Sequence, residues 1–288
     1  SACGKTTLVS TLFGDIDPPL RLVGGKVWYR VVEEQLDLFS LRPEERRELR
    51  WSFISYVPQS SMSNLNPVIK LKGSFRDFLE SHVPHQTKRD VFEIARQHLA
   101  ELGLPPNVLE AYPHQLSGGM RQRAVIALAS FLSPRVLITD EPVTALDVVV
   151  QRGVLQLLKE VQEKLENALV IVTHDMGVLA NIADRIGIMY AGKMIEEARV
   201  ETIFEQPLHP YTRYLINSLP QFGDKGMRES APGAPPSLVD LPSGCAFHPR
   251  CRFAMEMCSQ DVPECRSVDH QHRVACWLMQ EGEDQYAS

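Results

Sequence analysis

The sequence has 288 residues, 44% of them apolar, and a formal net charge of −6. This length and composition allow one large domain and a smaller appendage around a sizeable apolar core. The charges lie interspersed without a basic block, which argues against electrostatically driven binding to nucleic acid or to an anionic membrane. The apolar runs are too short to cross a bilayer and no secretory leader opens the chain, so the sequence predicts a cytosolic protein.

The first part of the chain predicts strands alternating with helices. A helix opens on a Gly-Lys-Thr turn at Gly4 and closes at Gly14, whose missing side chain suits a left-handed cap. The next elements are a β-rich segment at 25–32, a charged surface helix at 43–50 and a strand at 53–57.

A helical insertion follows, and then the strand signals return. Between about residues 60 and 132 we expect an amphipathic helix at 87–102 and a buried helix at 119–132. Further strands and helices are predicted in the order strand 136–139, helix 148–165, strand 169–173, helix 176–183 and strand 186–189. The short apolar strands with helices between them predict an α/β architecture with a parallel sheet.

The composition changes after about residue 205. A short helix begins within 209–213, and residues 223–244 are rich in Pro, Gly and Ser, as linkers are. Four of the six cysteines then fall in a short stretch, at positions 245, 251, 258 and 265. This pattern predicts a separate, small C-terminal unit, and in a reducing cytosol such a group suggests a metal before disulfides.

The opening residues Ser1-Ala-Cys-Gly-Lys-Thr-Thr7 match the second part of the phosphate-loop pattern G-x-x-x-x-G-K-[ST]. The first glycine of that pattern would lie upstream of Ser1, so the match is incomplete. Backbone N–H groups and the helix dipole would hold phosphates, Lys5 would neutralise them, and the Thr6 hydroxyl would bind magnesium. Taken alone, Gly-Lys-Thr fits a surface helix cap equally well.

An apolar strand at 136–139 ends in two carboxylates, Asp140 and Glu141. Sheets of this class present their ligand sites at the carboxyl ends of strands. Asp140 would hold the magnesium shell, and Glu141 would orient or deprotonate the water that attacks a γ phosphate.

Just upstream, Leu116-Ser-Gly-Gly-Met-Arg-Gln-Arg123 is the most specific motif in the sequence. Two glycines at a helix start allow close approach of a phosphate, and the Ser117 hydroxyl adds a donor. The segment therefore suits an anion that is held from outside the chain.

The order of these motifs resembles an ABC-transporter nucleotide-binding domain over residues 1–205, with a helical subdomain at about 60–132 and the extension at 206–288. The resemblance implies a P-loop NTPase (RecA-like) core with a β-rich edge, and strands and an adenine-stacking aromatic residue before Ser1. It also implies that Gln59 contacts the magnesium site, that Asp147 lies in a loop crossing a dimer interface, and that His174 contacts the γ phosphate. The predicted nucleotide and magnesium site is Gly4, Lys5, Thr6, Thr7, Gln59, Ser117, Gly118, Gly119, Asp140, Glu141, Asp147 and His174. Each of the last-named loop residues has a simpler alternative, for Asp147 a helix N-cap and for His174 a strand-end histidine.

Family members work as a sandwich in which the Ser-Gly-Gly segment of one subunit closes on ATP held by the other. An isolated monomer should therefore be nearly inactive, and residues 1–288 alone should bind ATP poorly. The resemblance implies hydrolysis rather than sensing alone, because Glu141 and the Leu-Ser-Gly-Gly run are intact.

The spacing of Cys245, Cys251, Cys258 and Cys265 offers four thiolates to a soft metal. The segments 206–213 and 232–238, together with Cys-Ala-Phe-His-Pro-Arg-Cys, resemble the tail of oligopeptide and dipeptide importer ATPases. That tail can carry a [4Fe–4S] cluster, which we expect here, with zinc or buried thiols as alternatives. Cys276 is not expected to be a ligand.

The resemblance implies an ATP-hydrolysing subunit that energises peptide import from the cytoplasmic face of the cell membrane. Its expected partners are a second, related ATPase that forms a heterodimer with it, two transmembrane permease subunits and, indirectly, an external substrate-binding protein, with no nucleic acid. The alternatives are an importer of nickel or oligosaccharides, a soluble ABC ATPase acting on ribosomes or nucleic acid, and a sensor that never hydrolyses nucleotide.

Overall fold

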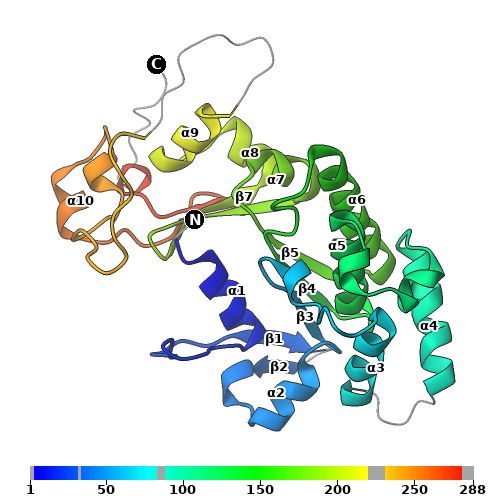
Figure 1. The fold of residues 1–288 in the computed structure, drawn as a ribbon. Coiled ribbons are helices and arrows are strands. Elements are labelled where there is room, and N and C mark those ends of the chain that lie inside the picture. Colours follow the sequence, from blue (N-terminus) through cyan, green and yellow to red (C-terminus); the bar gives the residue numbers. More distant parts are fainter. Residues whose placement is uncertain (1–2, 32–33, 83–87, 220–230, 281–288) are drawn as a thin grey trace. The chain divides into compact units, whose positions relative to one another are not determined.

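The computed structural model describes residues 3–31, 34–82, 88–219 and 231–280 (Figure 1). The chain divides into two compact units. We call Thr6–Thr173 the N-terminal unit, and Ser1–Lys5 together with His174–Ser288 the C-terminal unit.

The N-terminal unit is built on a three-stranded parallel sheet of order β3-β4-β5. Its strands are β3 (Ile54–Val57), β4 (Val136–Asp140) and β5 (Ala168–Val172). Ile54 lies opposite Val136, which in turn lies opposite Ala168. Helix α1 (Lys5–Phe13) packs through Val9 and Phe13 against side chains of β3 and β4. Apolar residues on both faces of short strands produce this buried parallel sheet, as the sequence predicts.

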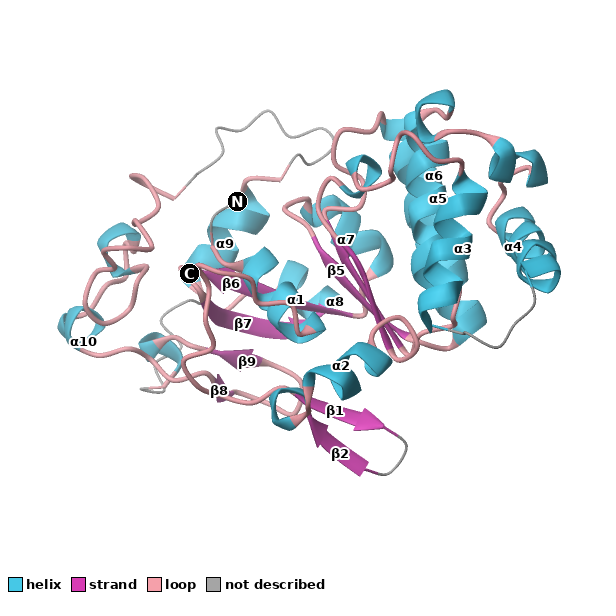
Figure 2. Ribbon diagram, turned by 60° about the horizontal axis from the view of Figure 1, so that its bottom comes forward, coloured by secondary structure: helices cyan, strands magenta, loops and turns pink. Residues whose placement is uncertain are grey.

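An antiparallel hairpin and further helices complete the N-terminal unit (Figure 2). The antiparallel hairpin is β1 (Trp28–Val31) with β2 (Glu34–Asp37), and α2 (Pro43–Leu49) follows it. The helices after β3 are α3 (Leu71–His82), α4 (Lys88–Glu101), α5 (Gly118–Ser130) and α6 (Val148–Leu165). The predicted helical insertion between two strands of one sheet is therefore present.

The C-terminal unit contains an antiparallel sheet of order β6-β7-β9-β8 (Figure 2). Its strands are β6 (Arg185–Tyr190), β7 (Lys193–Arg199), β8 (Arg266–Ser267) and β9 (Arg273–Val274), and its helices are α7 (Met176–Ile182), α8 (Val200–Glu205), α9 (Pro210–Asn217) and α10 (Glu256–Gln260). One apolar cluster joins β6 and β7 to α8, α9 and Phe247.

Two expectations change in this unit. The strand at 186–189 was expected in the parallel sheet, but β6 pairs in antiparallel fashion with β7, which the sequence did not predict. Residues after 206 do not form a cysteine-rich unit of their own, because β9 pairs with β7 and completes the sheet. Within the described residues, no helix is both long and apolar enough to cross a bilayer.

Candidate functional site

The predicted phosphate loop leads into α1. Gly4 has a φ of 93°, a left-handed value that suits glycine, and Lys5 is the first residue of the helix. Thr6 and Thr7 form its exposed first turn. The Lys5 Nζ lies 3.7 Å from the Cys3 Sγ. A helix start with free backbone N–H groups and an adjacent lysine can bind phosphate oxygens.

The two predicted carboxylates occupy the carboxyl end of β4. Asp140 is its last residue and is only 1% exposed. Glu141 follows with a left-handed φ of 51°, and its N–H donates to the Val172 carbonyl at 2.8 Å. The Thr144 Oγ1 donates to Glu141 Oε2 at 2.9 Å. A non-glycine residue with positive φ is strained, and such strain concentrates at functional sites.

Oxygen donors gather where β3 and β4 end. Val57, the last residue of β3, pairs with Thr139 of β4. Gln59, two residues after β3, and Asp140, the last residue of β4, therefore lie at the same edge of the sheet. Tyr56 lies near Asp140, and burial, with a smaller contribution from that carboxylate, raises the pKa of the tyrosine. A buried carboxylate is costly without a compensating charge. The Asp140 carboxylate, the Gln59 amide and the Thr6 hydroxyl are the hard oxygen donors that magnesium prefers, so the residues fit this ion.

The Ser-Gly-Gly segment begins α5. Ser117 is the N-cap of α5, and its side chain accepts a hydrogen bond from the Met120 N–H at 3.3 Å. A Cβ on Gly119 would lie 2.7 Å from a methyl carbon of Val150 in α6, which is closer than real side chains pack. The glycine at this position is thus required by packing between α5 and α6, a reason that the motif alone did not reveal.

Asp147 and His174 have local roles that match their simpler alternatives. Asp147 caps α6, where its Oδ1 accepts from the Val150 N–H at 3.0 Å. His174 is exposed and follows β5 in the chain, and Asp175 caps α7 through the N–H groups of Gly177 and Val178. Neither local role tests the contacts with nucleotide that the resemblance implies.

The prediction of an iron–sulfur cluster is wrong. Among the described residues, no group of three or more His, Cys, Asp or Glu side chains could hold a metal ion, and the six cysteines are free thiols. One small cavity is lined by Cys245, Cys251, Cys258 and also Cys276, which was not expected there. Cys265 lines a second cavity, together with Cys245. Burial raises the pKa of Cys245, that of Cys251 to about 11 and that of Cys276 to about 12. Burial thus disfavours the charged thiolate form of these three cysteines.

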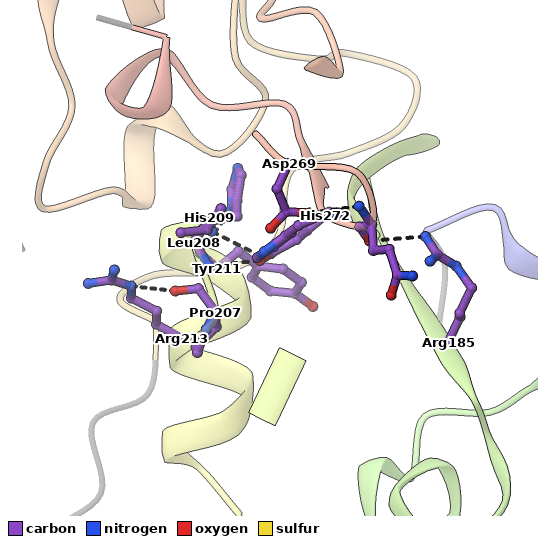
Figure 3. Close-up of polar contacts among 10 residues, drawn as sticks. Arg185, Pro207, Leu208, His209, Tyr211, Arg213, Asp269 and His272 are labelled. Atoms are coloured by element: carbon purple, nitrogen blue, oxygen red, sulfur yellow. Dashed lines mark hydrogen bonds and ion pairs between the residues drawn. The ribbon is translucent and has the colours of Figure 1, made fainter. Parts of the chain in front are cut away.

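A buried polar cluster in the C-terminal unit was missed (Figure 3). Glu196 of β7 is fully buried, and its carboxylate accepts from the backbone N–H groups of Leu208 and His209 at 2.7 and 3.0 Å. The His272 Nε2 donates to the same carboxylate at 2.8 Å, and Asp269 accepts from the His272 N–H. The hydrogen bonds of Glu196 therefore connect the start of α9 and the loop before β9 to strand β7.

His209 itself is neutral in this environment. It is 1% exposed, and burial lowers its pKa to about 3. Its Nδ1 accepts a hydrogen bond from the Tyr211 N–H at 3.0 Å, and the Arg213 Nε donates to the Pro207 carbonyl at 2.8 Å (Figure 3). Within the 206–213 motif, His209 is thus the N-cap of α9. No local sequence signal identified Glu196 as the partner of this segment.

Comparison with known proteins agrees with these features. Residues 1–144 match the family described as ABC transporter, and residues 195–258 match the C-terminal region of oligopeptide/dipeptide transporters. The chain is 43% identical over 284 residues to the dipeptide transport ATP-binding protein DppD of Caldanaerobacter subterraneus subsp. tengcongensis, which covers 98% of this chain and 86% of the relative. It is 37% identical to the oligopeptide transport ATP-binding protein OppD of Haemophilus influenzae, with the same coverage of 98% and 86%.

A solved structure shares the fold. A dimeric bacterial ABC transporter cassette, MJ0796, superposes with a TM-score of 0.58 at 26% identity, covering 69% of this chain and 82% of that one. Together with the matches in sequence, this shows that the chain belongs to the ATP-binding proteins of the oligopeptide/dipeptide ABC transporter family.

Proposed function

We propose that this chain binds and hydrolyses ATP, and that hydrolysis drives the import of dipeptides or oligopeptides through a membrane complex. The observation that carries the proposal is the end of β4, where Glu141 is held in a left-handed conformation and bonded to Thr144 beside the buried Asp140. This arrangement suits a base that orients water beside a magnesium ion. The names of the relatives support peptides as the cargo.

In this proposal, the residues of the phosphate loop bind the nucleotide. Lys5 and the α1 N–H groups hold the β and γ phosphates, while Thr6, Gln59 and Asp140 hold magnesium. Magnesium, when bound, neutralises charge on the phosphates. Glu141 takes the proton from the attacking water.

A second subunit completes the site. Ser117 and Gly119 of one ATPase subunit face the nucleotide of the other, Asp147 lies at their interface, and His174 contacts the γ phosphate. We expect the partner to be a related ATPase, docked with this chain beneath two membrane permease subunits on the cytoplasmic face. An external binding protein delivers the cargo.

The experiment uses the full transporter, with its binding protein, in proteoliposomes. We expect Glu141→Gln to abolish ATP hydrolysis and uptake while nucleotide still binds, and the matched control Glu163→Gln, on the exposed side of α6, to behave as wild type. Uptake of labelled dipeptides and oligopeptides is measured beside uptake of nickel. Unaltered ATP hydrolysis by Glu141→Gln contradicts the assignment of Glu141 as the base. Uptake of nickel without uptake of peptides contradicts peptides as the cargo.

A further inference from the structure

The turn that joins β6 to β7 contacts the phosphate loop. The Gly192 N–H donates to the Cys3 carbonyl at 2.9 Å, and a Cβ on Gly4 would lie 3.5 Å from the Gly192 Cα. Ala191 and Gly192 have φ values of 47° and 80°, the left-handed pair that a tight hairpin turn requires. Because Cys3 is two residues before Lys5, this turn supports the backbone that presents the lysine.

The residue before the turn, Tyr190, packs in an aromatic cluster with Tyr211 and Phe247. Tyr190, the last residue of β6, is 5% exposed, and its ring centroid lies 4.7 Å from that of Tyr211 and 5.3 Å from that of Phe247. Burial raises the pKa of Tyr211, with smaller contributions from the nearby Cys3 and Tyr190. Tyr190 directly precedes the turn residues Ala191 and Gly192, so the cluster holds the strand end from which the turn starts.

Arg250 connects this cluster to the segment before the cysteines. One guanidinium N–H donates to the Tyr190 hydroxyl at 3.1 Å. The others donate to three successive backbone carbonyls, to Ala231 at 3.1 Å, Pro232 at 2.6 Å and Gly233 at 3.1 Å. A single planar cation thus holds residues 231–233 and the end of β6 together, and the fixed fork of donors makes this geometry specific to arginine.

From these contacts we infer that Arg250 and Tyr190 are positioning residues for the phosphate loop. The hydrogen bonds between Arg250 and the backbone of residues 231–233 then set the affinity for ATP. The contacts run from the 231–233 carbonyls through Arg250 and Tyr190 to Gly192 and Cys3. Neither side chain touches the reacting atoms, so each acts only through the backbone of the loop. This inference rests on the proposed binding of ATP by Lys5.

The test uses the complete transporter in proteoliposomes and measures KM and kcat for ATP together with thermal unfolding. We expect Arg250→Ala to raise KM by about fivefold, which corresponds to about 1 kcal/mol, with kcat changed by less than about twofold. Tyr190→Phe, which keeps the ring and removes one hydroxyl, should raise KM by about two- to threefold without lowering the unfolding temperature. Because the two groups act in series, the double variant should equal Arg250→Ala alone.

Three controls isolate this effect. Arg250→Lys keeps the positive charge but loses the planar set of guanidinium donors, so it should restore only part of the affinity for ATP that Arg250→Ala loses. Arg199→Ala, an exposed arginine on the same sheet, and Tyr214→Phe, on the same aromatic cluster, should leave KM unchanged.

Wild-type KM in Tyr190→Phe, or additive effects in the double variant, would overturn the inference. Where Arg250→Ala is too unstable to purify, KM of Tyr190→Phe alone decides. A wild-type transporter that does not hydrolyse ATP contradicts the proposed function instead. A hydrolysing transporter with unchanged KM in the variants contradicts only this inference.

Discussion

Replacing Glu196 by alanine should loosen the C-terminal unit. The side chain is 0% exposed and is the acceptor for two backbone N–H groups and for the His272 ring. Glu196→Ala leaves these three donors buried in a space that the small methyl group does not fill.

The expected cost follows from those three contacts. A buried donor that loses its acceptor costs about 1–3 kcal/mol. Because the donors share one cavity and can relax together, we expect a total of about 3–5 kcal/mol rather than a simple sum. Glu196→Gln keeps one acceptor oxygen and should cost about half as much.

Hydrogen exchange resolved to peptides over β7 and α9 is the suitable assay, because the chain has two units and need not unfold in one step. A loss of 3 kcal/mol corresponds to a fall in protection of roughly 150-fold. The control Glu201→Ala removes a carboxylate that is 61% exposed and 3.6 Å from Arg199, and should have little effect. Protection in Glu196→Ala within about fivefold of wild type would refute this reasoning.

Three further predictions concern single contacts. Thr144→Val removes the hydrogen bond to Glu141 and should lower kcat for ATP by about tenfold, whereas Thr144→Ser should retain activity; equal rates for both would contradict a positioning role. Gly119→Ala forces a Cβ to within 2.7 Å of Val150 and should cost about 1–3 kcal/mol in thermal unfolding, an effect that a second change, Val150→Ala, should relieve. His209 has a folded pKa of about 3, below its unfolded value, so stability is full above about pH 6.5 and falls by about 1.4 kcal/mol per pH unit below it. His209→Asn, which keeps an acceptor, should flatten that part of the pH profile, and an unchanged slope would contradict the assignment.

The elements that carry the predicted nucleotide site could be predicted because local chemistry determines them. The helix after Gly4, the strand before Asp140 and the helix after Ser117 lie where their glycines, caps and apolar runs place them. The bounds predicted for the helix at 148–165 agree with α6, whose N-cap Asp147 and apolar stripe are both visible in the sequence.

The C-terminal unit was harder to predict because its contacts are distant in sequence. The pairing of β7 with β9 joins residues about 77 positions apart. Glu196, which bonds to His272, sits in the run Lys-Met-Ile-Glu-Glu-Ala-Arg, where no alternation of apolar and charged residues marks it as buried. The cysteine spacing was misleading for the same reason. Near-equal intervals suggested four ligands of one site, but one cavity brings Cys276 together with Cys245, Cys251 and Cys258, and Cys265 lines a different cavity with Cys245.

The packing of Gly119 against Val150 has a mechanical consequence. The two residues lie in the first turns of α5 and α6, so the caps Ser117 and Asp147 stand on helix ends that are locked in contact. The missing Cβ of Gly119 allows the start of α5 to lie this close to Val150, and a side chain at this position would push the two helix ends apart. We expect a displacement of the Ser-Gly-Gly segment to be passed to the 145–147 loop through this contact.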